Sequence, residues 1–363
     1  MKVAFICTSP SVSSYEYLNL NGGSGTLLSL LNVAYFLKDQ NSEVTVIGKI
    51  KDKDKCRNEP VEFIDLQESN EILAFLNLVK FDVIIIVGHA ISFLDEVQCE
   101  FDSKVIYWAH NWVNTKTLHD YYKNGIIDEV VYVSRYQFLK SWKQSKLNPK
   151  FLIYSRYIYN SLELPFYTKK NIEEKSCVDI AYLSYPSKNK GFPETIQLVR
   201  NLIDQGIDTK LHLLGDMKLY DGDDNSLHEC YDIMLNENDE IESFLILHGT
   251  VGKFDLDRIL SSIDLSIGGL TGSETFCYAL AESLAKGIPV VSLNKGGQVD
   301  FIEHERNGYL VKDLSDAQRY ITGYLSLSYD VKLDFENKAI DSISKFSIDV
   351  IGKQWKKRLR IKN

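Results

Sequence analysis

Apolar runs of strand length alternate along the chain with segments in which apolar residues recur every three or four positions. Runs of about four to eight apolar residues are typical of strands buried on both faces, whereas a period of about 3.6 residues indicates helices. In the first half, this pattern predicts strands at Met1–Cys7, Glu43–Gly48, Phe81–Val87, Lys104–Trp108 and Val130–Val133, helices at Thr26–Leu37 and Gln137–Trp142, and pocket-shaping loops at Tyr15–Leu20 and Thr115–Asn124. Strands that alternate with helices predict a parallel, doubly wound sheet.

The alternation stops at Asn160–Lys175, which contains Pro165 and ends in a run of polar and charged residues, so we expect the domain linker there. It then restarts, with predicted strands at Val178–Leu183, Lys210–Leu214, Phe244–His248, Leu265–Ile267 and Pro289–Leu293, and helices at Phe192–Gln205, Asp255–Ser261 and Tyr278–Lys286. Residues 342–363 predict a terminal helix. We therefore expect two Rossmann-like domains, residues 1–165 and 166–341, that face a central ligand cleft with the carboxyl ends of their strands.

Composition excludes several classes of protein. The 363 residues fit two domains, and a formal net charge of −9 argues against a nucleic-acid partner. Six cysteines are scattered without the close pairs that zinc sites or disulfide frameworks need. The chain does not start with a signal-peptide pattern, and its apolar runs are shorter than the ~18 residues of a membrane span. We expect a cytoplasmic protein.

The strongest chemical signal is a pair of acidic residues, Glu274 and Glu282, eight positions apart, the second of which lies in the predicted helix Tyr278–Lys286. A helix over this span would separate them by ~12 Å along its axis and by about 80° around it, so both could face one elongated ligand. The backbone N–H groups of Phe276, Cys277 and Tyr278 would open the helix and offer a site for a diphosphate. The two carboxylates could then accept hydrogen bonds from a sugar and a ribose. Two solvated glutamates on an amphipathic helix are the alternative interpretation.

Further motifs surround this acidic pair in a fixed order. They comprise Gly287-Ile-Pro-Val-Val291, Gly296-Gly297 and Asn307-Gly-Tyr-Leu-Val311 downstream, and residues 180–191, 211–215 and 248–251 upstream. Together with the E-x7-E spacing of Glu274 and Glu282, they resemble the retaining glycosyltransferases of family 4 (glycosyl transferases group 1), which have the GT-B fold. This resemblance implies that residues 342–363 form a helix that crosses back to the first, acceptor-side domain.

The resemblance also implies a function and assigns roles to residues of the second domain. The implied reaction is a metal-independent, retaining transfer of a sugar from a nucleoside diphosphate, UDP or GDP, to an acceptor hydroxyl, without a resident cofactor. Glu274 would contact the sugar, Glu282 the ribose and Lys190 the diphosphate. The donor site would also include Tyr185, Lys188, Val251, Phe276, Cys277 and Tyr278. Tyr185 stands where the family usually has a phosphate-binding arginine. The acceptor would be a glycan, a glycolipid or a small molecule, in bacterial surface polysaccharide, glycolipid or glycoconjugate synthesis.

Two features of the first domain resemble the same family. The loop Asn21-Gly-Gly-Ser-Gly25 resembles its glycine loop, which places Gly22 and Gly23 in the donor site. His110 follows the predicted strand Lys104–Trp108 and resembles the active-site histidine, so we group it with Glu274 and Lys190 as catalytic. His89 is the second choice. A tight turn and a structural histidine are the alternatives.

Other features leave alternatives open. Asp221-Gly-Asp-Asp224 looks like the metal-binding DxD motif of another glycosyltransferase class, but a solvated turn is favoured and no metal is expected. The basic end from Lys353 to Lys362 suggests a peripheral contact with anionic lipid, whereas a solvated helix face is favoured. The GT-B fold also hosts nucleotide-sugar epimerases and phosphorylases, and a sugar-nucleotide-binding subunit with a degraded site is the non-enzymatic alternative.

Overall fold

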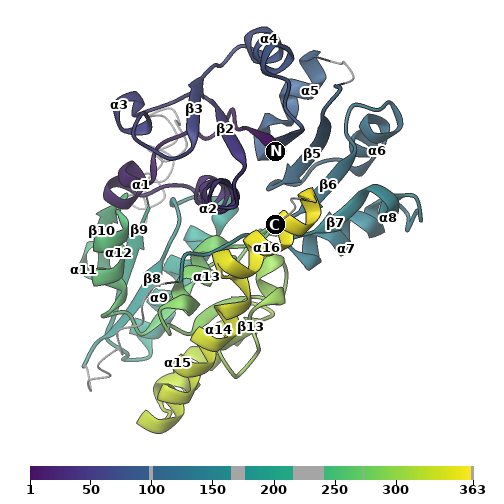
Figure 1. Cartoon of the computed structure of the whole chain (residues 1–363). Coiled ribbons are helices and arrows are strands. Elements are labelled where there is room, and N and C mark those ends of the chain that lie inside the picture. The colour runs from purple at the N-terminus through teal and green to yellow at the C-terminus, as the bar shows by residue number, and fades with distance from the viewer. Residues whose placement is uncertain (98–100, 165–175, 216–240, 273, 361–363) are drawn as a thin grey trace. The chain divides into compact units, whose positions relative to one another are not determined.

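Contacts between residues divide the chain into two compact units. The structure is a computed structural model that describes residues 1–97, 101–164, 176–215, 241–272 and 274–360. The first unit consists of Met1–Leu18, Gly23–Glu163 and Phe346–Asn363, and the second of Asn19–Gly22 and Leu164–Lys345. Each unit is built around its own parallel sheet (Figure 1).

The sheet of the first unit has seven strands in the order β3-β2-β1-β4-β5-β6-β7, and all neighbouring strands are parallel. The strands are β1 (Lys2–Ile6), β2 (Glu43–Gly48), β3 (Glu62–Asp65), β4 (Val83–Val87), β5 (Lys104–Ala109), β6 (Glu129–Tyr132) and β7 (Ser155–Tyr157). The helices are α1 (Tyr15–Asn21), α2 (Gly25–Asp39), α3 (Lys53–Cys56), α4 (Ser69–Val79), α5 (Ser92–Val97), α6 (Thr115–Lys123), α7 (Arg135–Gln144) and α8 (Phe151–Tyr154), with a 3₁₀ turn η1 (Gly88–Ile91). Apart from the additional edge strand β7, this is the Rossmann order 3-2-1-4-5-6.

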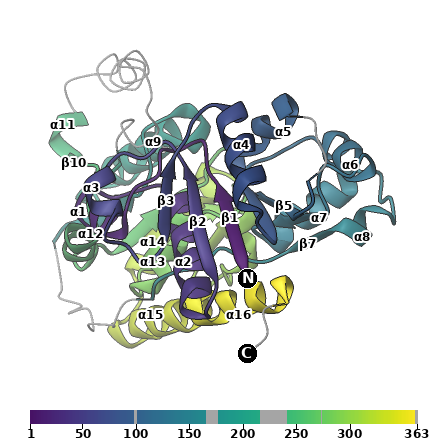
Figure 2. The same ribbon diagram turned by 45° about the horizontal axis from the view of Figure 1, so that its top comes forward.

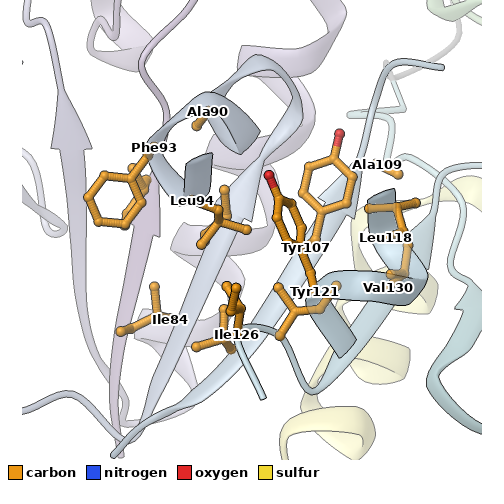
Figure 3. Close-up of a cluster of buried hydrophobic side chains, with 14 of the residues drawn as sticks. Ile84, Ala90, Phe93, Leu94, Tyr107, Ala109, Leu118, Tyr121, Ile126 and Val130 are labelled. Carbon is orange, nitrogen blue, oxygen red and sulfur yellow. The ribbon is translucent and has the colours of Figure 1, made fainter. Parts of the chain in front are cut away.

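Both faces of this sheet are buried, which explains why its central strands are uninterrupted apolar runs. Every residue of β4 is at most 4% exposed. Successive side chains of a strand point to opposite faces, so a run of this kind needs a cover on each face. On one face, Ile84 packs in a cluster with Phe93 and Leu94 of α5 and Tyr121 of α6 (Figure 3).

The sheet of the second unit has six parallel strands in the order β10-β9-β8-β11-β12-β13, the Rossmann order again. The strands are β8 (Val178–Tyr182), β9 (Thr209–Leu214), β10 (Leu245–Gly249), β11 (Leu265–Ile267), β12 (Val290–Leu293) and β13 (Gly308–Val311). The helices are α9 (Phe192–Asp204), α11 (Ile241–Phe244), α12 (Lys253–Leu260), α13 (Tyr278–Ala285), α14 (Leu314–Leu325) and α15 (Tyr329–Ile343). Three 3₁₀ turns complete the description: η2 (Lys188–Lys190), η4 (Gly297–Asp300) and η5 (Ser344–Phe346).

The C-terminal helix α16 (Ile348–Leu359) returns to the first unit and packs against α2, as Figures 1 and 2 both show. The ring of Trp355 lies 4.8 Å from that of Trp108 in β5, centroid to centroid. Gly352 lies against the ring of Phe36, where a Cβ atom would overlap the aromatic carbons. The predicted fold class, two Rossmann-like units of the GT-B type with a C-terminal helix that crosses back, is confirmed.

A buried carboxylate attaches the end of α16 to the first unit. Glu129 in β6 is 1% exposed, and its Oε2 accepts a hydrogen bond of 2.6 Å from Nε of Arg358 and lies 3.1 Å from Nζ of Lys104. Arg156 contacts the other carboxylate oxygen. Nζ of Lys356 donates to Oε1 of Gln40 at 2.8 Å. The expectation that the basic end is only a solvated helix face is therefore wrong for Arg358 and Lys356, since a buried carboxylate requires cations nearby.

Two expected loops are helices. Tyr15–Leu20 forms α1, where Oγ of Ser14 accepts from the backbone N–H of Tyr17 at 3.1 Å. Thr115–Asn124 forms α6, where the side chain of Asn114 accepts from the N–H of Lys116 at 2.8 Å. Both segments are short and rich in polar residues, so apolar periodicity did not reveal them as helices. The capping residues Ser14 and Asn114 are the better sequence signal for their start. Among the described residues, no helix combines the length and apolar character needed to cross a bilayer.

We predict that Arg358→Ala lowers the free energy of unfolding of the first unit by about 2 kcal/mol, because Glu129 loses a charged partner and α16 loses an anchor. All four tryptophans (Trp108, Trp112, Trp142 and Trp355) lie in this unit, so tryptophan fluorescence during urea unfolding reports on it alone. The exposed neighbour Lys357 is the control, and Lys357→Ala should change the value by at most about 0.5 kcal/mol. Equal losses in both variants would contradict the anchoring role.

Candidate functional site

The order of strands in the second unit reverses between β8 and β11. Connections leave β8 toward β9 and β10 on one side, and β11 toward β12 and β13 on the other. Ligands of such sheets bind at the carboxyl ends of the strands where the order reverses. Ile180 of β8 pairs with Leu265 of β11, so the loops after these two strands begin side by side. They carry Lys190 and Glu274.

The structure brings these two predicted catalytic residues together. Nζ of Lys190 lies 2.8 Å from Oε1 of Glu274, and both side chains are partly buried, at 28% and 22% exposure. Oγ1 of Thr271 donates to the carbonyl oxygens of Lys188 and Asn189 at 3.1 and 3.2 Å, which fastens one loop to the other. A partly desolvated ion pair at a strand reversal is suited to bind a charged ligand.

Lys190 is held in place from its own loop as well. Oγ of Ser187 accepts from the backbone N–H of Lys190 at 3.3 Å, and Gly191 follows with a φ of 83°. A Cβ atom at Gly191 would lie 3.0 Å from Cβ of Leu270, so this glycine permits the close approach of the two loops. Nζ of Lys190 lies 6.0 Å from the ring centroid of Tyr185, within range of a cation–π contact. Lys188 is exposed.

The segment between the two glutamates is helical only in its second half. Helix α13 begins at Tyr278, and its N-cap Cys277 has the left-handed φ of 71°. The predicted start of this helix at Tyr278 is confirmed, and because the residues from Glu274 to Cys277 are not part of it, the ~12 Å separation of a fully helical span does not apply. Phe276 is buried, and the pKa of the Cys277 thiol is raised by burial and by the charge of Glu274.

A second glycine loop supports the start of α13. The backbone N–H of Gly297 donates to the carbonyl oxygen of Glu274 at 2.8 Å. A Cβ atom at Gly297 would overlap the carbonyl oxygen of Thr275 and lie 2.6 Å from Cα of Phe276. Gly296–Gly297 therefore lets two backbones meet directly under the residues that were predicted to bind the donor.

Glu282 lies on α13 and is partly buried. Burial raises its pKa to about 7, and the charge of Asp257 contributes, whereas Lys253 and Lys286 act in the opposite direction. Nζ of Lys286 is paired with Asp257 at 2.7 Å. Glu282 therefore exchanges a proton near neutral pH, a property that its sequence position alone did not indicate.

The glycine loop of the N-terminal region is divided between the two units. Gly22, with a φ of 75°, belongs to the second unit, and a Cβ atom there would overlap the carbonyl oxygen of Val251. Two residues of the predicted donor site, Gly22 and Val251, therefore lie in contact. Gly23 belongs to the first unit, where a Cβ atom would lie 2.5 Å from Cδ2 of Leu18.

His110 lies in the first unit, directly after β5, and is 5% exposed. Burial lowers its pKa to about 3, so the imidazole is neutral at pH 7. At the strand reversal between β1 and β4, a Cβ atom on Gly88 would lie 3.4 Å from Cβ of His110 and 3.3 Å from Nδ2 of Asn111. Sequence reasoning missed Gly88, although its φ of 55° favours glycine, and it missed Asn111. The second choice, His89, is exposed.

A chain of polar side chains crosses three strands of the second unit and was not predicted. Nε2 of His212 lies 2.9 Å from Oδ1 of Asp179, and Nδ1 of His212 lies 3.0 Å from Nε2 of His248. The pKa of His248 is lowered by burial and by the electrostatic influence of the neighbouring His212 and Arg258. The network joins β8, β9 and β10, and Val251 lies in the loop that follows β10. Asp221–Asp224, the metal-like motif, lies outside the described residues.

The two Rossmann-type units and the returning C-terminal helix have the fold of the GT-B glycosyltransferases. Residues 167–339, just under half of the chain, match the family model described as Glycosyl transferases group 1. The second unit therefore carries the sequence pattern of that family. Spore coat protein SA of Bacillus subtilis (strain 168) is 22% identical over 142 residues. That stretch covers 39% of this chain and 37% of the Bacillus protein, so the chain matches just over a third of this relative's length.

Solved structures of the same fold match the whole chain. Anabaena HepE, crystallised with UDP and glucose, gives a TM-score of 0.75 at 17% identity and covers 99% of both chains. Sucrose-phosphate synthase of Thermosynechococcus elongatus gives 0.74 at 14% identity and covers 99% of this chain and 98% of its own. A TarM mutant of S. aureus, bound to fondaparinux, α-GlcNAc-glycerol and UDP, gives 0.75 at 13% identity and 99% coverage of both chains.

We predict that Gly297→Ala lowers the free energy of unfolding by about 2 kcal/mol, because the methyl group meets backbone atoms that cannot move aside. Gly323 in α14 is the matched control, since a Cβ atom there meets no atom within 4 Å. Gly323→Ala should stabilise the helix by about 0.5–1 kcal/mol. Thermal unfolding followed by circular dichroism should show melting temperatures that shift in opposite directions. A Gly297→Ala protein as stable as wild type would contradict the close packing.

We predict that Glu282→Gln stabilises the protein by about 3 kcal/mol at pH 8 and that this gain falls below about 1 kcal/mol at pH 5. The folded protein keeps the Glu282 proton up to about pH 7, whereas the unfolded chain loses it near pH 4.5, so wild-type stability falls as the pH rises between these values. Melting temperatures measured from pH 5 to pH 8.5 test this. Glu71→Gln, at an exposed position of α4, should show no such pH dependence. A difference that is constant with pH would contradict the shifted pKa.

Proposed function

We propose that the protein is a retaining, metal-independent glycosyltransferase. It moves a sugar from a nucleoside diphosphate to an acceptor hydroxyl. The observation that carries this proposal is the Lys190–Glu274 pair, which lies where the strand order of the second unit reverses and beside the start of α13. The family match of residues 167–339 and the UDP-bound relatives of the same fold support it.

In this proposal the unliganded protein keeps Lys190 and Glu274 paired, and the donor separates them. The diphosphate takes the place of Glu274 at Nζ of Lys190, because it carries more negative charge and approaches the N-terminus of α13. Glu274 is then free to accept hydrogen bonds from the sugar hydroxyls. Charge grows on the diphosphate as the bond to the sugar breaks, and Lys190 stabilises that charge in the transition state.

The remaining steps transfer the sugar and the proton of the acceptor. The acceptor oxygen attacks the anomeric carbon on the face from which the diphosphate leaves, and the acceptor proton passes to the departing phosphate oxygen. The configuration of the sugar is thereby retained. His110 is neutral at pH 7 and contacts the donor sugar through a hydrogen bond rather than through charge. Gly22, Gly23, Tyr185, Lys188, Val251, Phe276, Cys277 and Tyr278 complete the donor site, and Glu282 contacts the ribose.

We place the activity in the synthesis of bacterial surface polysaccharide, glycolipid or glycoconjugate, with a glycan, glycolipid or small-molecule acceptor. The relatives are consistent with this range: one was crystallised with UDP and glucose, and another with glycan ligands and UDP. Thermal shifts measured with UDP-, GDP-, dTDP- and ADP-sugars identify the donor, because a ligand of the folded state raises the melting temperature. Incubation of that donor with and without acceptor distinguishes transfer from epimerisation. Activity that persists in EDTA supports independence from metal.

We predict that two substitutions have different effects on diphosphate binding but lower turnover to a similar extent. Lys190→Ala should weaken binding of the free nucleoside diphosphate at least tenfold and lower turnover about a hundredfold or more. Glu274→Gln should leave nucleoside diphosphate binding unchanged or make it tighter, because Lys190 loses its internal competitor, while turnover falls about as far. Calorimetric titration with the diphosphate and an assay of sugar transfer measure the two effects.

The exposed residue Lys312 provides the control, and Lys312→Ala should behave like wild type in both measurements. Turnover within threefold of wild type in both site variants would contradict the assignment of the site. Weaker diphosphate binding in Glu274→Gln would contradict the exchange of partners at Lys190 but leave the assignment of the site in place.

A further inference from the structure

One stretch of the first unit differs in charge from the rest of the chain. Residues 130–162 contain no Asp or Glu, although the formal net charge of the protein is −9. The same stretch contains six basic residues: Arg135, Lys140, Lys143, Lys146, Lys150 and Arg156. A local excess of positive charge in an acidic protein indicates a surface that meets an anionic partner.

Exposed apolar side chains lie among these cations. Leu147 is 53% exposed, Leu152 is 44% exposed and Ile153 is 64% exposed. Lys143, Lys146 and Lys150 are exposed as well. We call these six residues, between the end of α7 and the end of α8, the α7–α8 patch. Neighbouring apolar and basic residues of this kind mark an interaction surface rather than isolated surface positions.

The packing of α8 explains why its apolar residues face outward. Phe151 and Tyr154 are buried, and their rings lie in an aromatic cluster in which Phe138 is 5.7 Å from Phe151 and Tyr122 is 4.4 Å from Tyr154. These two anchors occupy the inner side of a four-residue helix, so Leu152 and Ile153 between them lie on the outer side. The core therefore fixes the exposed pair in place.

The backbone before α8 holds the third apolar residue outward. Lys146 and Leu147 have φ values of 57° and 58°, a left-handed conformation that L-residues with a side chain rarely adopt. Their N–H groups donate to the carbonyl oxygens of Lys143 and Trp142, each at 3.1 Å. Helix ends of this shape usually contain glycine. Lys146 and Leu147 are thus both strained and exposed. Backbone strain of this kind is often found at binding sites, which supports a binding role for this surface.

We infer that the α7–α8 patch docks the protein on an anionic lipid surface. Leu147, Leu152 and Ile153 enter the boundary between headgroups and acyl chains, and the three lysines lie at the level of the lipid phosphates. A second copy fits the patch poorly, because a symmetric contact of the patch with itself opposes lysine to lysine without a carboxylate in the surrounding stretch. The inference goes beyond the proposed sugar transfer and does not depend on it.

This location differs from the basic C-terminal end that the sequence suggested. In α16 the apolar residues beside the basic end, Trp355 and Leu359, are buried, and the exposed Val350 lies in the first turn, away from that end. Arg358 and Lys356 are hydrogen-bonded to Glu129 and Gln40. Lipid docking needs apolar insertion as well as charge, and the α7–α8 patch offers both.

Sedimentation with vesicles tests the inference on the full chain. The vesicles contain phosphatidylcholine alone or with 30 mol% phosphatidylglycerol, at about 50 and 300 mM salt. Wild type should bind only the anionic vesicles, and more weakly at high salt. The triple variant K143Q/K146Q/K150Q should bind about a hundredfold more weakly, at about fivefold for each lysine. L152S/I153S keeps every charge and should bind at least tenfold more weakly, because it removes apolar insertion.

Two control variants keep the result specific. K116Q/K295Q/K312Q makes the same change in net charge at exposed lysines elsewhere, and K353Q/K357Q tests the exposed part of the C-terminal end. Both should bind the anionic vesicles within threefold of wild type. Failure of wild type to bind, equal losses in the scattered-lysine control, or a loss only in the α16 variant would each overturn the inference. Analytical ultracentrifugation tests the remaining alternative, a dimer. If wild type self-associates and L152S/I153S does not, while vesicle binding is the same in both, the inference is also overturned.

Discussion

The site depends on one topological constraint, the reversal of strand order between β8 and β11. A parallel sheet covered by helices on both faces must send its connections outward from the reversal, so the loops after these two strands are left adjacent. Lys190 and Glu274 are 84 positions apart in the chain, yet their charged atoms lie 2.8 Å apart because these loops carry them. The first unit repeats the arrangement with different chemistry: Gly88, His110 and Asn111 meet beside the reversal of its own sheet.

Many of the motif residues support the site instead of forming it. Asn307 is fully buried, where its side chain accepts from the N–H of Glu303 at 2.8 Å and donates to the carbonyl oxygen of Phe301 at 2.9 Å. Gly297 lies under Thr275 and Phe276, and Gly191 permits contact with Leu270. These residues keep two backbones close together, a geometric task that tolerates few alternatives. These motif residues therefore indicate how the backbone packs around residues 274–278, and not only which side chains were predicted to bind the donor.

The sequence predicted the strands well because burial on both faces leaves no alternative pattern to runs such as Val83–Val87. Ordered motifs singled out Lys190 and Glu274, and the structure brings their charged groups together, while their roles stay predictions. It did not predict α1 or α6, whose formation depends on caps by Ser14 and Asn114. The network of Asp179, His212 and His248 was equally hidden, since its members come from three strands and only the register of the sheet brings them together. Apolar periodicity predicts single helices and strands. It does not predict contacts between side chains of different strands, such as this network.

The family resemblance implies a second cation at the position of Tyr185, and a tyrosine there changes the electrostatics of the site. A guanidinium beside Lys190 would compete with it for Glu274 and would carry its charge at every pH. The tyrosine ring instead lies 6.0 Å from Nζ of Lys190 and favours a single cation at this position. Glu274 therefore neutralises Lys190 in the unliganded chain, and no excess positive charge has to be kept partly buried. The Lys190–Glu274 ion pair stabilises the partly buried charges. An anion that binds Lys190 therefore has to compete with the Glu274 carboxylate. In the proposed function, affinity for a diphosphate reflects the difference between two ion pairs, so donor binding is tied to the release of the residue that is proposed to contact the sugar.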